Sequence, residues 1–505
     1  MYVIAIDIGT QGTKGGLYSQ ALQCICTAFE ASNLISPAAG TVWQEPEELY
    51  ASVLRVTAEL MAKAQIAPGQ VAAIGIDGQM AGILGIGPDG QAVTPYDSWL
   101  DTRCEAYVRQ MAKEGREVVK WTGGPVSFTH GPKILWWKNE HPDVYKKVSK
   151  FVLPHAYVVG RLTGLSGGDA YSDYTTLHFS GFADNRNKAW AAPLLDRFGV
   201  AEAKMPRIVS PFTPIGGLTQ EAAAQMGLKP GTPVAAGCGD TAASTFGAGM
   251  LHPGMVLDCA GTASVLSCIT DSFEPDIAHE TMTLMRSPVD GLFTPLAYLG
   301  GGGLCVRWFR DQLSGRPAAS YETLEVEAST VPPGCEGLTF IPHFSGRALP
   351  NDPMLKGGFI GLDFKHKRGH MYRAVLEAVA YEYRYYLDIL KTLYPACPFS
   401  QMLSIGGGAQ SPLMNQIKAD VLGLCVKTLS AADTALVGSA VIAGVAAGLI
   451  TDYEKTLQGS IRLGREFVPE KESADAYAPC QAQYVKAVAA FSTFFNSTER
   501  SENHA

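Results

Sequence analysis

An aspartate followed by a Gly/Thr turn, directly after an apolar strand, is the feature of this sequence that most limits its fold. Residues 2–6 are apolar, Asp7 ends the run, and residues 9–13 read Gly-Thr-Gln-Gly-Thr. Residues 14–18 can return as a second strand, so the segment predicts a β-hairpin closed by a Gly/Thr loop. The backbone N–H groups and hydroxyls of such a loop are typical binding groups for an anion.

The same pattern occurs again in the middle of the chain. Apolar residues 255–257 lead to Asp258, a Gly-Thr turn follows, and residues 265–269 form the returning run. Two copies predict two related halves that face each other and hold a polyphosphate from both sides. The sequence Leu-His-Pro-Gly at 251–254 is the natural boundary, so we expect domains at 1–250 and 251–505.

The rest of the chain alternates between strand and helix patterns. Residues 45–64 have helical spacing, and residues 71–76 form an apolar strand that ends at Asp77. This alternation favours an α/β architecture.

Composition excludes several classes of function. The net charge is −8, which argues against a broad nucleic-acid-binding face. The 11 cysteines show no spacing suited to zinc, so we expect reduced thiols. The N-terminus has no signal-peptide pattern, and the longest apolar stretch, residues 435–450, is short for a membrane span. We therefore expect a cytoplasmic protein without a membrane or nucleic-acid partner.

Two aspartates and a glycine run are candidates for chemistry. Asp7 offers oxygen ligands for Mg²⁺, although a turn-forming carboxylate is the alternative. Asp240 follows a strand and a Gly turn at the start of a small-residue helix; it is either an N-cap or a base that takes a proton from a hydroxyl. Residues 406–408 are all glycine after a strand, which favours close approach of a flat ring but also fits an ordinary strand-to-helix turn.

These motifs together resemble the FGGY family of carbohydrate kinases. The two Asp-Gly-Thr segments resemble its phosphate loops, and the glycine run with Asn415 resembles its adenosine motif. Residues 357–362 and 370–377 resemble its C-terminal signature. Residues 132–137 resemble the N-terminal one, except that His130 stands where a small residue is usual. The resemblance implies two actin-like (ribonuclease H-like) ATPase domains facing across a cleft.

The resemblance also implies roles for individual residues. Asp240 matches the catalytic base, and Asp7 and Asp240 match positions that place Mg²⁺. The residues that match acceptor-binding positions are Gln79, Met80, Trp99, Asp101, Arg103, Asp173, Asp240 and Thr241. The residues that match ATP-binding positions are Thr10, Gln11, Thr13, Lys14, Gly261, Thr262, Gly302, Gly303, Gly407, Gly408, Ala409 and Asn415.

The chain most resembles the xylulokinase-like members but departs from them at two positions. They usually have Met-His where this chain has Met80-Ala81, and Asn where it has Thr241. Glycerol kinases have Arg-Glu at the first pair, so the resemblance disfavours glycerol. A site built to bond a hydroxyl rejects analogues that leave its groups unpaired, so these departures predict a changed choice of sugar.

The expected activity is ATP- and Mg²⁺-dependent phosphorylation of a ketopentose or related polyol. Family members are often dimers, so a homodimer is expected by analogy. One alternative is a regulator that binds sugar and nucleotide on the same fold without catalysis. Another is an actin-like ATPase that acts on a protein partner, which would need an added substrate-binding domain.

Overall fold

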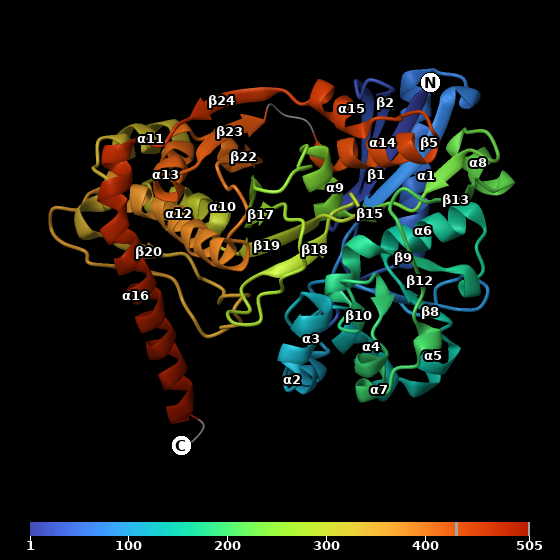
Figure 1. Cartoon of the computed structure of the whole chain (residues 1–505), viewed down its shortest axis with the longest axis horizontal. Coiled ribbons are helices and arrows are strands. Elements are labelled where there is room, and N and C mark those ends of the chain that lie inside the picture. The colour runs from blue at the N-terminus through green and yellow to red at the C-terminus, as the bar shows by residue number, and fades with distance from the viewer. Residues whose placement is uncertain (430–432, 503–505) are drawn as a thin grey trace.

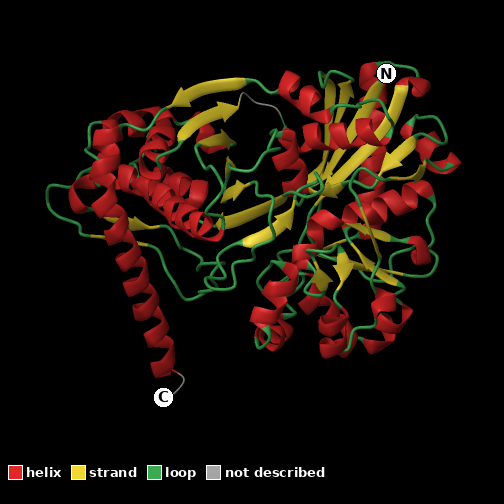
Figure 2. Cartoon of the chain, in the orientation of Figure 1, coloured by secondary structure: helices red, strands yellow, loops and turns green. Residues whose placement is uncertain are grey.

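The computed structural model describes residues 1–429 and 433–502, and its two halves are each built around a mixed sheet (Figures 1 and 2). In the N-terminal sheet, β1 lies between antiparallel β2 and parallel β5. Its order is β13 (Pro214–Gly217), β14 (Pro233–Ala235), β5 (Val71–Gly78), β1 (Tyr2–Ile8), β2 (Gly12–Ser19) and β3 (Cys24–Ala31), with β15 (Cys238–Gly239) also on β5.

The C-terminal sheet repeats this plan. Here β16 lies between antiparallel β17 and parallel β22, just as β1 lies between β2 and β5. Its order is β18 (Thr283–Arg286), β19 (Phe293–Leu299), β17 (Ser264–Cys268), β16 (Met255–Ala260), β22 (Gln401–Ile405), β23 (Cys425–Leu429) and β24 (Leu463–Phe467). Both predicted hairpins are confirmed, but their aspartates face opposite sides of their sheets: Asp7 lies on the α14 side of the first sheet, and Asp258 lies on the α12 side of the second.

Helices cover both sheets. On the first sheet, an apolar cluster joins the strands to α1 (Pro46–Ala64), α6 (Pro154–Thr163) and α8 (Gln220–Met226). On the second, the long α12 (Arg368–Leu393) forms the centre of the largest core. The helices around α12 are α10 (Gly302–Leu313), α11 (Tyr321–Ser329), α13 (Pro412–Leu422) and α16 (Lys471–Glu502).

Two helices join the halves. The helix α14 (Thr434–Ala446), late in the sequence, packs on β1 and β5 of the first sheet and on α9 (Asp240–Gly247), as Figure 1 shows. It is apolar on nearly all sides and buried, which is expected of a helix enclosed by protein and explains the apolar stretch at 435–450. The boundary at 251–254 stays a prediction.

A smaller lobe lies below the first sheet in the view of Figure 1. It contains α2 (Glu105–Ala112), α3 (Gly115–Thr122), α4 (His130–Glu140), α5 (Pro142–Lys147) and α7 (Ala192–Phe198) around a separate apolar cluster.

All 11 cysteines carry free thiols. Among the described residues, no helix combines the length and apolar composition needed to cross a lipid bilayer.

Candidate functional site

Three carboxylates meet at one edge of the first sheet. In register, Asp7 on β1 lies opposite Asp77 on β5, and Lys14 on β2 lies on its other side. Cys238 on β15 pairs with Asp77, so Asp240 begins α9 at the same edge. Strand pairing therefore collects side chains that lie far apart in the sequence.

Asp7 is buried close to other carboxylates. Burial raises its pKa to about 7, and the charges of Asp240 and Asp433 add to the rise. Its Oδ1 is buried and accepts no hydrogen bond from any described residue. The nearby Lys14 Nζ is held 2.6 Å from Oδ2 of Asp433. Crowded carboxylates with one ammonium among them favour a bound cation.

The carboxylates at this edge of the sheet fit Mg²⁺ that is bound partly by other ligands. Among the described residues, no group of three or more His, Cys, Asp or Glu side chains is arranged to enclose a metal. Mg²⁺ commonly binds through one or two carboxylates together with phosphate oxygens and water. The orphaned oxygen of Asp7 suits that mode, whereas an all-protein cage is not formed.

Asp258, the aspartate of the second hairpin, has a different environment because it faces α12 and α13. It is fully buried, and Lys418 Nζ lies 2.5 Å from its Oδ2. Tyr383 and Ser404 donate further hydrogen bonds at 2.7 and 2.8 Å. The charge of Asp258 is balanced by Lys418, and both of its oxygens accept hydrogen bonds. The second hairpin can therefore bind a ligand through its turn but not through this aspartate.

Asp240 has one engaged and one open oxygen. Oδ1 accepts the Thr241 N–H at 2.5 Å and the Thr241 hydroxyl at 3.1 Å, and no described residue donates to Oδ2. The N-cap is Gly239, not Asp240. Burial raises the pKa of Asp240, while the bonds from Thr241 and the charge of His155 oppose the rise. A carboxylate held this way can accept a proton at Oδ2.

A hydrogen-bond chain links the first turn to the predicted acceptor segment. Trp99 Nε1 donates to Thr10 Oγ1 at 2.9 Å, Thr10 donates to Gln79 Oε1 at 3.0 Å, and Gln79 Nε2 donates to Gln44 at 2.9 Å. Trp99 remains 42% exposed, so its ring is available to a ligand.

Two predicted phosphate-binding side chains of this turn lie differently. Gln11 is exposed. Thr13 is buried, with its hydroxyl 2.6 Å from Ser52 on α1. Thr13 as placed can offer a phosphate only its backbone.

The predicted pair Asp101 and Arg103 form one unit. Arg103 Nε donates to Asp101 Oδ2 at 2.8 Å, and its Nη2 donates to Asp97 at 2.6 Å. Its guanidinium lies 4.4 Å from the ring centroid of Trp136. Two carboxylates and an aromatic face therefore fix the arginine in place.

Asp173 does not face open space. It is fully buried; its Oδ2 lies 3.0 Å from His155 Nε2, and its Oδ1 accepts the Thr175 N–H at 2.8 Å. The Thr175 hydroxyl in turn accepts the Gly239 N–H at 3.2 Å. This arrangement gives no support to a direct acceptor contact; Asp173 instead holds the backbone that precedes Asp240.

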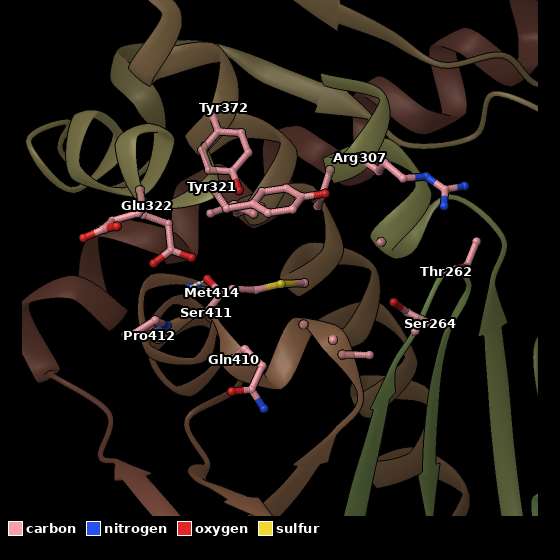
Figure 3. Close-up of a pocket in the computed structure, with 18 residues that line it drawn as sticks. Thr262, Ser264, Arg307, Tyr321, Glu322, Tyr372, Gln410, Ser411, Pro412 and Met414 are labelled. Atoms are coloured by element: carbon pink, nitrogen blue, oxygen red, sulfur yellow. Dashed lines mark hydrogen bonds between the residues drawn. The ribbon is translucent and has the colours of Figure 1, made fainter. Parts of the chain in front are cut away.

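A cavity of about 760 Å³ lies wholly in the C-terminal half (Figure 3). The predicted residues that line it are Gly261, Thr262, Gly303, Gly407 and Gly408. Figure 3 shows Tyr321, Tyr372 and Glu322 across the cavity from Ser411, Pro412 and Met414. No local pattern in the sequence marks Tyr321 or Glu322, because they begin α11, which contains no glycine run. Arg307 lies on α10, one turn after the glycines at 300–303.

Asn415 and Gly302, two other predicted nucleotide-binding residues, support the backbone around this cavity. Asn415 Nδ2 donates to the carbonyls of Ala409 and Ser411, both at 2.9 Å, and so fixes the glycine turn. At Gly302, a Cβ would lie 2.0 Å from the Ser264 hydroxyl. Close packing therefore demands glycine there.

Comparison with known proteins follows the same division into halves. Models of the FGGY family of carbohydrate kinases match residues 2–247 with the N-terminal domain and residues 275–447 with the C-terminal domain. The xylulose kinase of Bacillus subtilis (strain 168) is 28% identical over 483 residues, covering 94% of each chain. The gluconokinase of Bacillus licheniformis is 26% identical over 490 residues, covering 94% of this chain and 93% of the other.

A solved structure extends the comparison to the fold. The crystal structure of ligand-bound xylulose kinase from Lactobacillus acidophilus matches with a TM-score of 0.90 at 23% identity, covering 98% of this chain and 99% of that one. The expected pair of actin-like domains is thereby confirmed. With both domains matched in order, the chain belongs to the FGGY family of carbohydrate kinases.

Proposed function

We propose that this chain is an ATP-dependent kinase that transfers the γ-phosphoryl group to a hydroxyl of a ketopentose or related polyol. The observation that carries the proposal is the state of Asp240. Its Oδ2 accepts no hydrogen bond from a described residue, and Asp240 lies near Asp7, a buried carboxylate with a raised pKa. Phosphoryl transfer depends mainly on positioning and charge stabilisation, and this edge of the sheet offers both.

The nucleotide occupies the cavity of the C-terminal half. Its base lies on Gly407 and Gly408, and its phosphates extend past Thr262 toward the first hairpin, where Thr10 and Lys14 lie. Asp7 is the residue that would hold Mg²⁺, with Asp240 nearby. The bound cation would supply charge neutralisation to the β- and γ-phosphates.

The acceptor lies against Gln79, Trp99 and the Asp101–Arg103 unit. Its hydroxyl attacks the γ-phosphorus while Asp240 Oδ2 accepts the proton. The raised pKa of Asp240 makes it a better base than a free aspartate. Closure of the two halves excludes water, which would compete as an acceptor.

An uncharged acceptor fits the charges of this region. Arg103 is neutralised by Asp97 and Asp101, and Lys133 Nζ donates to the carbonyl of Asp101 at 2.7 Å. With both cations engaged, a sugar acid would lack a strong partner. This supports a xylulose-like acceptor over a gluconate-like one. The proposal includes a cytoplasmic location, where ATP is available, and a homodimer.

The test is ADP release with Mg-ATP across D- and L-xylulose, D- and L-ribulose, xylitol, erythritol, glycerol and gluconate. We expect one neutral ketose or polyol to be strongly preferred and EDTA to abolish turnover. A preference for gluconate would refute the acceptor assignment. ATP and sugar binding without ADP release would instead support the catalytically silent alternative.

A further inference from the structure

The helix α4 presents three hydrogen-bond donors on one face to the acceptor segments. His130 Nε2 lies 2.6 Å from the Met80 carbonyl, Lys133 donates to the Asp101 carbonyl at 2.7 Å, and Trp137 donates to Asp97 at 2.6 Å. Positions i, i+3 and i+7 share a helix face, so one rigid element, in the lower lobe of Figure 1, holds both acceptor segments, residues 79–81 and 97–103.

His130 is a neutral donor in this set. Burial lowers its pKa to about 4, although the Met80 carbonyl opposes the fall. A neutral ring that donates from Nε2 carries its lone pair on Nδ1, and no described residue bonds to Nδ1. The ring also lies edge-on to Phe179, with centroids 6.3 Å apart.

The segment that His130 holds lies between the acceptor region and the base. Gln79 is part of the chain to Thr10 and Trp99. Met80 packs directly against Gly239, where a Cβ would lie 2.4 Å from Met80 Cγ. Ala81, which follows, has only a methyl group and can form no side-chain hydrogen bond. A shift of the Met80 carbonyl would therefore move Gln79 on one side and press on the residue before Asp240 on the other.

We propose that His130 is a positioning residue that sets acceptor specificity, by holding the Met80 carbonyl and with it the Gln79–Ala81 segment. This proposal rests on the proposed kinase function. Loss of the N–H leaves a buried carbonyl unpartnered and releases the segment, while Lys133 and Trp137 still hold Asp101 and Asp97. The acceptor side of the reaction is affected, and the nucleotide cavity in the other half is not.

A matched set of variants isolates the Nε2 donor. Glutamine can place an amide N–H where His Nε2 lies, whereas asparagine reaches only as far as Nδ1. The set is His130→Gln, His130→Asn and His130→Ala. His178→Leu is the packing control, because His178 is buried in the same region beside Phe179 but bonds to none of the acceptor segments.

Steady-state kinetics on purified protein give the readout, with melting temperatures for each variant. We expect His130→Asn and His130→Ala to raise the acceptor KM about tenfold, as expected for an unpartnered buried carbonyl, and to alter the kcat/KM ratio between two epimeric acceptors. The KM for ATP stays unchanged. His130→Gln restores both acceptor values, and His178→Leu changes stability without changing the ratio.

Equal behaviour of the Gln and Asn variants would overturn the proposal, as would an unchanged selectivity ratio or an equal rise in the KM for ATP. Wild-type protein without turnover on any acceptor would refute the proposed function separately. In that case calorimetric titration with the same sugars decides the role of His130. Weaker sugar binding by His130→Asn than by His130→Gln supports it, and equal or absent binding overturns it.

Discussion

At the scale of single residues, the site depends on how hydrogen bonds divide the oxygens of each carboxylate. Asp240 has Oδ1 held by Thr241 and Oδ2 open, whereas Asp173 and Asp258 have both oxygens engaged. Charge alone does not distinguish these three residues. The availability of an unengaged oxygen separates a candidate base from structural aspartates.

Thr241 offers a test of this division. Thr241→Val removes the hydroxyl donor but keeps the N–H bond, so Asp240 gains rotational freedom. We expect kcat to fall about tenfold, as for one lost hydrogen bond to a charged group, with little change in melting temperature. Thr241→Ser keeps the hydroxyl and serves as the control. A valine variant with wild-type kcat would show that Thr241 does not orient the base.

The sequence predicted local features of the site better than remote ones. The strands ending at Asp7 and Asp258 could be recognised because strand, turn and aspartate are contiguous. The neutralisation of Asp258 could not, because Lys418 lies 160 positions away. The place of Thr13 in the turn predicts that its side chain binds phosphate, but strand alternation directs that side chain toward Ser52 on α1.

At the scale of elements, close crossing of α9 and α14 joins the two halves. A Cβ on Gly247 would lie 1.9 Å from the Thr434 carbonyl oxygen, and one on Gly438 would lie 2.1 Å from that of Ala243. The two helices therefore approach to backbone contact at glycines. The sequence showed these glycines within an apolar run but gave no sign of the partner helix.

Gly438→Ala tests the crossing. The added methyl group must push the helices apart, and we expect a loss of about 2 kcal/mol or more in the free energy of unfolding, with reduced activity because Asp240 begins α9. Gly459→Ala in α15 (Tyr453–Ser460) is the control, since a Cβ there meets nothing within 4 Å. It should stabilise slightly, by up to about 1 kcal/mol. Equal melting temperatures for the two variants would contradict the account.

The docking of α16 on α12 rests on a buried ionic network. Glu382 on α12 accepts bonds from Arg347 at 3.1 Å, His343 at 3.2 Å and Tyr484 of α16 at 2.7 Å. Burial alone would raise the pKa of Glu382, but Arg347 and His343 outweigh it and hold the pKa well below its ordinary range. The charged form is therefore stabilised by folding.

The ionised Glu382 makes the free energy of unfolding depend on pH. A depressed carboxylate pKa contributes stability above the unfolded value of about 4.3 and loses it as the pH falls toward the folded value. Glu382→Gln should cost about 3 kcal/mol at pH 7, and the gap from wild type should narrow below about pH 4.5. Glu454→Gln, which breaks an exposed contact with His252, is the control. A gap that is constant with pH would exclude the ionic explanation.

At the scale of the whole molecule, two halves of the same plan have taken different roles. The first keeps an uncompensated aspartate and the candidate base, and the second keeps the cavity and a neutralised aspartate. The repeat predicted the two-fold design from sequence. The division of roles depends on the face of the sheet that each aspartate occupies and on Lys418, which only the folded chain brings to Asp258.

The central claim is that Asp240 Oδ2 accepts the proton of the acceptor hydroxyl. The most direct measurement compares Asp240→Asn with wild type, recording ADP release with the preferred acceptor and ATP affinity by calorimetry. The account predicts a fall in kcat of about 10³-fold, within the range for a lost general base, and an ATP affinity close to that of wild type. A variant that retains more than about a tenth of the wild-type kcat would contradict the claim, because asparagine cannot take the proton.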